Sequence, residues 1–259
     1  MLMIALAVVH RYRPIPKPLE QPSTFPGITQ VATIDSLLAG VYDGETRLDV
    51  LSSYGNFGIG TFQGLDGEMV LLDGVFYQVK ADGNVYRPGL LMTTPFASVM
   101  FFPKYGVGNN LNPAADYESL CRQLDQSVPN PNVPVAIRID GHFSTVRTRS
   151  VPAQQKPYKP LAEVTKNQPE FDFENVDGTV IGFRLPEYVR GINVPGYHLH
   201  FITADRKRGG HLLRIAVESG RFTVVSGHRF QVLLPENVAD FSDVDFSKDR
   251  SKELEKVEK

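Results

Sequence analysis

The sequence predicts an α+β fold of two β-rich domains, with mixed or antiparallel sheets and a few short helices. Apolar or alternating runs of strand length recur in both halves of the chain. Asp-Gly and Gly-Asn turn signals separate several of these runs. A polar, proline-bearing stretch over residues 152–169 divides the halves. We therefore expect an N-terminal domain over residues 28–152 and a C-terminal domain over residues 153–259.

Residues 1–27 are expected to form an arm ahead of the folded body. Residues 11–27 are rich in proline, which favours an extended conformation. The apolar run at residues 1–9 has no Lys or Arg before it and no small-residue cleavage site after it, so a complete signal peptide is not predicted. It is also shorter than the ~20 residues that span a bilayer, so no membrane association is expected. A cytoplasmic location follows, although the apolar run leaves secretion open.

The first domain is predicted to open with a short amphipathic helix after Thr33, an N-cap residue type. Residues 58–86 alternate strand-like runs with turn signals, which indicates an antiparallel meander. Further strands are expected within residues 92–102, 134–140 and 142–151, and a helix around Cys121 lies between the first two. The Asp140-Gly141 pair is expected to join the last two strands as a hairpin.

The second domain is again predicted to be mostly strand. A helix is expected within residues 160–168, and another within residues 247–259 at the C-terminus. Strand-like runs occupy residues 179–186, 196–202, 211–219, 222–228 and 230–235.

Composition excludes several classes of protein. Apolar residues make up 42% and charged residues 22% of the chain, as in ordinary folded proteins. A net charge of −2 provides no basic field for a phosphate backbone, so nucleic acid is not expected as a partner. The single cysteine, Cys121, excludes a disulfide within the chain and is expected to be a buried structural thiol.

Three histidines predict a metal centre. His198 and His200 stand two apart on a predicted strand, so both imidazoles project from one face. The polar residues 203–210 predict a reversal that brings His211 beside His200. Three imidazoles with one open coordination position are typical of catalytic zinc. The other histidines, His10, His142 and His228, are expected to be surface or hydrogen-bonded packing residues.

Several other polar residues are candidates for an active site. Glu68 opens an apolar strand, and Arg147 and Arg149 lie two apart, as a clamp for a carboxylate requires. Three glutamates, Glu253, Glu255 and Glu258, crowd the last predicted helix. Each also has a structural explanation, as a turn residue, a surface charge or a solvated helix face. On the residues alone, those explanations are preferred for all but one of the arginines.

Two groups of motifs make the sequence recognisable. They are Tyr-Gly-Asn-Phe-Gly-Ile-Gly-Thr-Phe with Leu-Asp-Gly-Glu, and Gly-Tyr-His-Leu-His-Phe followed by Gly-Gly-His. Together with the segments over residues 33–79, 136–151 and 155–171, they resemble the α-acetolactate decarboxylase family from about Ile28 to the C-terminus. The resemblance implies decarboxylation of (S)-2-acetolactate to (R)-acetoin and carbon dioxide by a homodimeric lyase. The active site is then a zinc site between the two domains, with other divalent metals left open.

The resemblance also implies roles for individual residues. His198, His200 and His211 match the zinc ligands, while Thr61, Glu68 and Arg149 match catalytic and substrate-binding residues. A glutamate in the C-terminal tail completes the site, and Glu258 matches it best, with Glu255 second. Zinc chelated by the substrate's hydroxyl and ketone would stabilise the enediolate, which Glu68 or Glu258 would protonate. The alternatives are a zinc-dependent hydrolase with the same three histidines and a β-rich module that only binds metal.

Overall fold

The computed structural model describes residues 26–103 and 108–258. The predicted leader, His10 and nearly all of the predicted arm lie outside the described residues. Within the described ranges, no helix combines the length and the apolar character that a membrane span requires.

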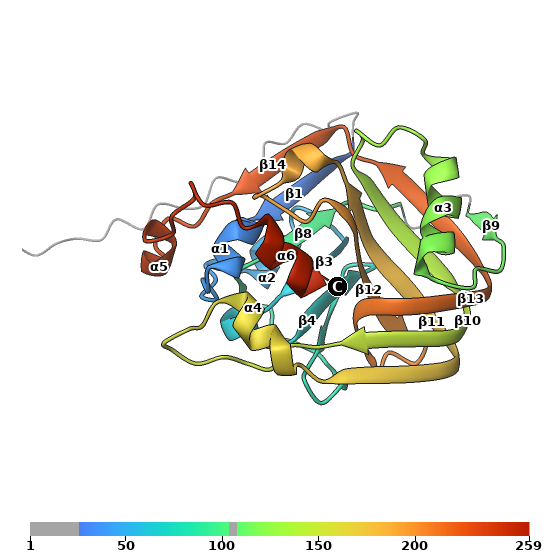
Figure 1. The fold of residues 1–259 in the computed structure, drawn as a ribbon, viewed down its shortest axis with the longest axis horizontal. Helices are drawn as coiled ribbons and strands as arrows, with labels where there is room; N and C mark the ends of the chain where they lie inside the picture. Colours follow the sequence, from blue (N-terminus) through green and yellow to red (C-terminus); the bar gives the residue numbers. More distant parts are fainter. Residues whose placement is uncertain (1–25, 104–107, 259) are drawn as a thin grey trace, which may run out of the picture.

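The first sheet has seven strands in the order β14-β1-β8-β3-β4-β5-β6 (Figure 1). Neighbouring strands are antiparallel except for the parallel pair β1–β14. The predicted meander is confirmed, because β3, β4, β5 and β6 follow one another in chain and in sheet. The strands are β1 (Gly27–Val31), β3 (Phe57–Thr61), β4 (Glu68–Leu72), β5 (Val75–Val79), β6 (Val85–Tyr86), β8 (Ala97–Met100) and β14 (Arg229–Leu233).

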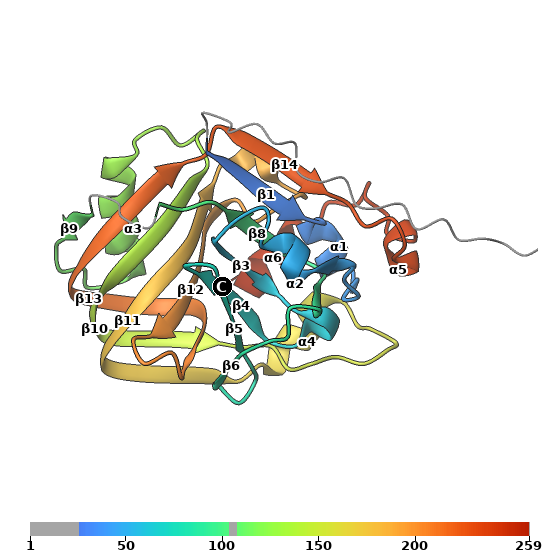
Figure 2. The ribbon, with the colours of Figure 1, turned by 180° about the vertical axis from the view of Figure 1, so that it is seen from behind.

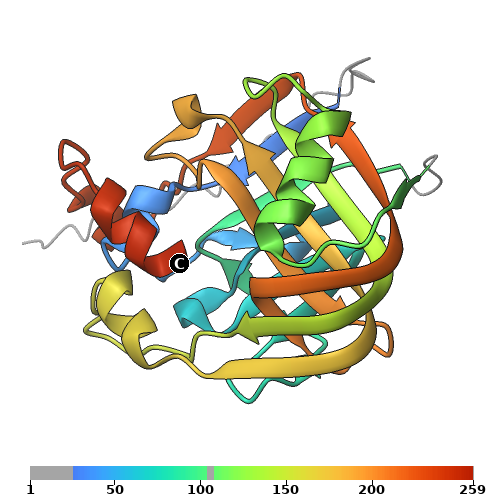
Figure 3. The ribbon, with the colours of Figure 1, turned by 45° about the vertical axis from the view of Figure 1, so that its right-hand side comes forward.

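The second sheet has five strands in the order β10-β11-β12-β13-β9. An additional β10–β13 pairing closes four of these strands around an apolar interior that contains Phe143 and Phe201. Figure 3 shows the long strands curving across the molecule beside helix α3. The strands are β9 (Asn109–Leu111), β10 (Val135–Arg149), β11 (Glu170–Leu185), β12 (Gly196–Thr203) and β13 (Gly209–Ser226). A small third sheet pairs β2 (Thr46–Arg47) with β7 (Thr93–Thr94).

The predicted hairpin at Asp140-Gly141 is wrong, because β10 runs unbroken through both residues. Gly141 pairs with Gly178 on one side and Gly220 on the other. A Cβ at Gly141 would lie 2.4 Å from the carbonyl oxygen of Ser219, so this glycine permits close strand approach and does not form a turn. The predicted strands over residues 211–219 and 222–228 likewise form one strand, β13.

The helices are short and lie around the sheets, which confirms the predicted fold class. Thr33 caps α1 by accepting a hydrogen bond from the Ser36 N–H at 3.2 Å. Cys121 is half-buried on α3, and burial raises the pKa of its thiol to about 12. The helices are α1 (Ile34–Leu38), α2 (Leu48–Leu51), α3 (Tyr117–Ser127), α4 (Leu161–Val164), α5 (Ala239–Ser242) and α6 (Ser251–Glu258). Three 3₁₀ turns are η1 (Gln63–Leu65), η2 (Thr165–Asn167) and η3 (Glu187–Val189).

An apolar layer joins the two larger sheets. Phe57 and Val70 of the first sheet pack in one cluster with Phe183 and Ile202 of the second. Figure 2 shows the two sheets side by side from behind. The two sheets do not follow the predicted boundary at residue 152. β14 comes after this residue but lies in the first sheet, whereas β9 and β10 come before it and lie in the second sheet. The domain division at residue 152 stays a prediction.

Helices α1, α4 and α6 gather at one side of this layer, and α6 brings the C-terminal end of the chain there (Figure 1). Leu37 of α1, Leu161 of α4 and Val257 of α6 share one buried cluster. The terminal helix predicted within residues 247–259 is thereby confirmed, and it is packed against the fold along one side.

Candidate metal centre

Strands β12 and β13 bring three histidines together. His200 and His211 are directly paired across the hairpin, and His198 lies two residues before His200 on the same face. The three ring centroids are 5.0 to 5.4 Å apart, and all three side chains are buried. Their ligand nitrogens lie within 4.8 Å of one another, so the group could hold a metal ion. The predicted hairpin and its histidine pair are confirmed.

The environment of His200 tests whether this group fits a metal. Its Nδ1 lies 2.8 Å from the carbonyl oxygen of Met69, which can only accept, so Nδ1 carries the proton and donates. Nε2 therefore keeps a lone pair, yet it is buried with no hydrogen-bond partner in the described part of the chain. A metal ion satisfies such an atom, and a carbonyl bound to the opposite ring nitrogen is a common support for a ligating histidine.

Burial keeps the three imidazoles neutral. It is the largest cause lowering each pKa, to about 3 for His198 and well below the usual range for His200 and His211. The charge of Arg149 lowers the pKa of each of them further. Neutral imidazoles are the form that ligates metals, so no proton competes for these nitrogens near neutral pH.

Two carboxyl groups, the buried Glu68 and the half-buried Glu258, flank the histidines from different parts of the fold. Glu68, on β4 opposite Thr61, places Oε2 3.5 Å from His200 Nε2. Glu258, at the end of α6, places Oε2 3.6 Å from His211 Nε2. Burial raises the pKa of both carboxyl groups to about 7, and the charge of Arg149 opposes that rise. Glu255, the other tail candidate, is exposed on α6, so the tail contributes Glu258 to this centre.

Arg149 lies at the end of β10, directly paired with His211, and its side chain is 3% exposed. One terminal nitrogen donates to Gln168 Oε1 at 2.8 Å and the other to the Val257 carbonyl at 2.6 Å. Its Nε is buried without a hydrogen-bond partner among the described residues. Arg147, by contrast, binds the Asp172 carboxylate at 2.6 Å at the surface, so only the second arginine of the predicted pair reaches the centre.

His198, His211, the two carboxyl groups and Arg149 border a cavity of about 40 Å³. Thr61 contributes a hydroxyl that donates to the Gly67 carbonyl at 2.7 Å, which leaves its lone pairs free to accept. The apolar part of the lining comes mainly from helices and 3₁₀ turns; it consists of Ile34, Leu37, Leu65, Phe96, Val151, Leu161 and Val257. The cavity therefore offers both charged groups and apolar surface that suits an alkyl group.

The structure brings all seven predicted site residues together, and it adds groups that the sequence analysis missed. The Met69 and Val257 carbonyls and the Gln168 side chain hold His200 and Arg149 in place. No spacing rule could have found these contacts, because two of them are made by backbone carbonyls, which carry no sequence signal, and the third joins side chains of residues that lie far apart in the chain. His142 and His228 are on the surface as predicted, and His142 Nδ1 lies 2.9 Å from Asp177 Oδ1.

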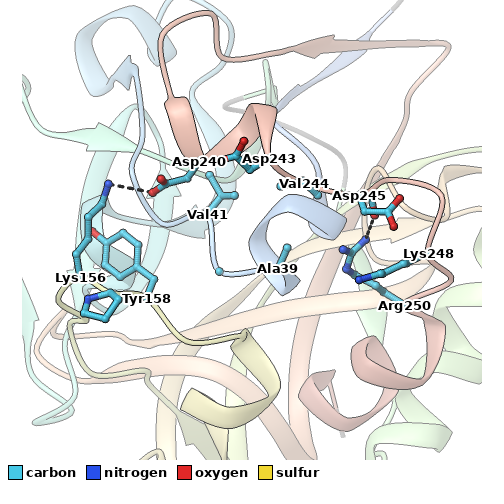
Figure 4. Close-up of a pocket in the computed structure, with 12 residues that line it drawn as sticks. Ala39, Val41, Lys156, Tyr158, Asp240, Asp243, Val244, Asp245, Lys248 and Arg250 are labelled. Atoms are coloured by element: carbon cyan, nitrogen blue, oxygen red, sulfur yellow. Dashed lines mark hydrogen bonds and ion pairs between the residues drawn. The ribbon is translucent and has the colours of Figure 1, made fainter.

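A larger groove of about 700 Å³ lies at the other end of α1, where Figure 4 shows its charged lining. Lys156 bridges Asp43 at 2.6 Å and Asp240 at 2.9 Å, and Arg250 donates to the Asp245 carbonyl at 2.9 Å. None of the three clustered histidines lines this groove. The smaller cavity is therefore the candidate reaction site.

Comparison with known proteins points to one family. The family model described as alpha-acetolactate decarboxylase matches residues 28–248. An alpha-acetolactate decarboxylase from Methanosarcina mazei is 47% identical over 230 residues, covering 89% of this chain and 79% of that protein. The Bacillus subtilis protein of the same name is 42% identical over 227 residues, covering 86% and 88%. The crystal structure of alpha-acetolactate decarboxylase from Bacillus subtilis strain 168 superposes with a TM-score of 0.86 at 40% identity, covering 90% of this chain and 99% of that one.

Proposed function

The chain belongs to the alpha-acetolactate decarboxylase family, and from this premise we propose that His198, His200 and His211 hold the zinc ion at which acetolactate loses carbon dioxide. The reaction itself, decarboxylation of acetolactate by a carboxy-lyase, follows from the family. Family membership also favours this interpretation over a zinc hydrolase and over a module that only binds metal.

The observation that carries the zinc proposal is the buried Nε2 of His200, which has no hydrogen-bond partner in the described part of the chain. Three neutral imidazole nitrogens suit zinc, which commonly takes three protein ligands in catalytic sites and leaves a position for substrate. A bound zinc ion would chelate the hydroxyl and ketone oxygens of acetolactate and, as a Lewis acid, stabilise negative charge developing on them. A zinc measurement on the purified protein, before and after replacing His211 by alanine, tests the assignment.

Arg149 is proposed to hold the substrate carboxylate. Its Nε has no hydrogen-bond partner within the described ranges, and its two terminal nitrogens donate to neutral carbonyl oxygens. The positive charge is therefore available to an incoming anion, and a guanidinium fits a carboxylate with two parallel hydrogen bonds. Thr61 is proposed to accept a hydrogen bond from the substrate hydroxyl, because its own proton is donated to Gly67.

Loss of carbon dioxide from (S)-2-acetolactate leaves an enediolate, which must be protonated on one face to give (R)-acetoin. Glu68 and Glu258 are proposed as the candidate acids, because each places a carboxyl oxygen beside a histidine, at 3.5 Å and 3.6 Å respectively. They approach from different elements, β4 and α6, so they face a bound substrate from different directions. Only one of them can deliver the proton that fixes the product configuration.

Replacing each glutamate by glutamine tests this assignment. General acid catalysis contributes roughly 10²–10⁴-fold, so the variant lacking the proton donor should lose at least about 100-fold in kcat. Glu255→Gln, on the exposed side of α6, is the matched control and should keep the activity of the unmodified enzyme. Enantiomeric excess of the acetoin and zinc content are measured alongside. Losses of only a few fold in both Glu68→Gln and Glu258→Gln would contradict the proposal.

Several expectations about the whole protein stay proposals. We expect a homodimer, which light scattering in solution would measure, and a cytoplasmic location. No nucleic-acid partner is expected, because the net charge of −2 supplies no attraction for phosphates.

A further inference from the structure

The hydrogen-bond partners of Arg149 are unusual for a buried arginine in this fold. Arg184, 8% exposed, binds the Asp125 carboxylate at 2.6 Å. Arg149, 3% exposed, binds only the amide oxygen of Gln168 and the backbone carbonyl of Val257. Within the described ranges, it forms no ion pair with a carboxylate. The guanidinium is thus oriented by neutral groups, and no carboxylate of the described residues neutralises its charge by direct contact.

A buried charge without a paired counter-ion is costly, and proteins ordinarily pair such groups. The cost is explained if the missing partner is an anion that arrives with the substrate. A neutral acceptor then suits the position better than a carboxylate, because a carboxylate would occupy the guanidinium and compete with that anion. A glutamine supplies the hydrogen bond without the competing charge.

The fold places Gln168 firmly for this purpose. It follows the 3₁₀ turn η2 and stands two residues before Glu170, which is the cross-strand neighbour of Arg149. The Ser150 N–H donates to the Pro169 carbonyl at 3.2 Å, so the chains on both sides of the contact are joined. Because the bonded Arg149 nitrogen can only donate, the oxygen of the Gln168 amide must face it.

We propose that Gln168 is a positioning residue for the decarboxylation, which aims the Arg149 guanidinium at the substrate carboxylate while leaving its charge unneutralised. This inference rests on the proposed function of Arg149. Gln168 itself acts through Arg149, to which its amide oxygen is bonded, and forms no hydrogen bond with the three histidines among the described residues.

The test compares Gln168→Glu and Gln168→Met with the control Lys166→Ala, which changes an exposed residue of the same 3₁₀ turn. Two inhibitors of acetolactate turnover serve as probes. One is 2-hydroxy-2-methylpropanoate, which carries a carboxylate, and the other is acetoin, which has none. Thermal unfolding and zinc content are measured for each variant, so that damage to folding or to the metal centre is recognised.

In Gln168→Glu, the inhibition constant of the carboxylate probe should rise at least tenfold, while that of acetoin changes less than twofold. Gln168→Met, which lacks the acceptor but adds no charge, should show a smaller rise in the same direction. The control should match the unmodified enzyme with both probes. A purely structural role would weaken both probes together. Equal changes for the two probes, or none, would overturn the inference.

Arg149→Met separates this inference from the proposed function beneath it. If that variant still binds the carboxylate probe as tightly as the unmodified enzyme, Arg149 does not hold the carboxylate and the proposed role of Arg149 fails. If Arg149→Met loses the probe while Gln168→Glu retains it, only the positioning role of Gln168 is wrong.

Discussion

Replacing Gly210 by alanine is expected to disturb the contact that joins β13 to β10 beside the histidines. Gly210 has a φ of +141° and precedes His211. A Cβ there would lie 2.4 Å from the carbonyl oxygen of Arg149, whereas carbon and oxygen in close contact are roughly 3.3–3.6 Å apart. One strand must therefore move by about 1 Å, and this movement would carry His211 away from Arg149.

The expected losses of stability and activity follow from two effects, backbone strain at residue 210 and displacement of the catalytic groups. Backbone strain at such a φ costs about 1–3 kcal/mol, which for a chain of this size lowers Tm by roughly 2–12 °C. A displacement of about 1 Å among catalytic groups costs on the order of 100-fold in rate. Gly210→Ala should therefore lose about 100-fold in kcat/KM and bind zinc more weakly.

Gly74→Ala is the matched control. Gly74 also has a positive φ, +80°, but its Cβ would meet only the Asn56 side chain at 4.0 Å, away from the histidines. Gly74→Ala should lower Tm by an amount similar to that of Gly210→Ala and leave kcat/KM unchanged. Acetolactate turnover, zinc content and thermal unfolding are measured for both variants. If Gly210→Ala keeps full turnover, close contact between β13 and β10 does not set the geometry of the centre.

Three further outcomes are expected. Chelation should abolish turnover and added zinc should restore it; turnover that persists in metal-free protein, verified by elemental analysis, would contradict a metal-dependent reaction. A chain ending at Lys256 lacks Val257 and Glu258 and should lose at least about 100-fold in kcat while keeping zinc, because the ligands lie on β12 and β13. Turnover close to that of the full chain would exclude the tail from the site. Leu161→Ala enlarges the cavity at an apolar lining residue, so kcat/KM for the ethyl homologue of acetolactate should rise relative to acetolactate itself, with about 2–5 kcal/mol lost in stability. An unchanged ratio of the two kcat/KM values would place the alkyl group elsewhere.

Local patterns in the sequence were enough for much of the fold. The meander over residues 58–86, the Thr33 cap and the terminal helix depend on neighbouring residues, and the structure confirms them. Gly141 shows where local patterns fail. An Asp-Gly pair looks the same whether it turns the chain or lies within a strand, and here the choice was made by β11 and β13 pairing on both sides.

The same division holds for the metal centre. The sequence by itself determined the histidine trio, because strand alternation and one short hairpin place His198, His200 and His211 together without help from distant residues. The motifs around them determined the family.

The convergence of Glu68, Arg149 and Glu258 was expected only through the family resemblance, since these residues lie far apart in the chain. Only the tertiary structure decided their environment, by folding β4, β10 and α6 onto the hairpin. Burial and charge proximity, which set the pKa of the carboxyl groups, are properties of atoms in space, and no order of residues encodes them directly.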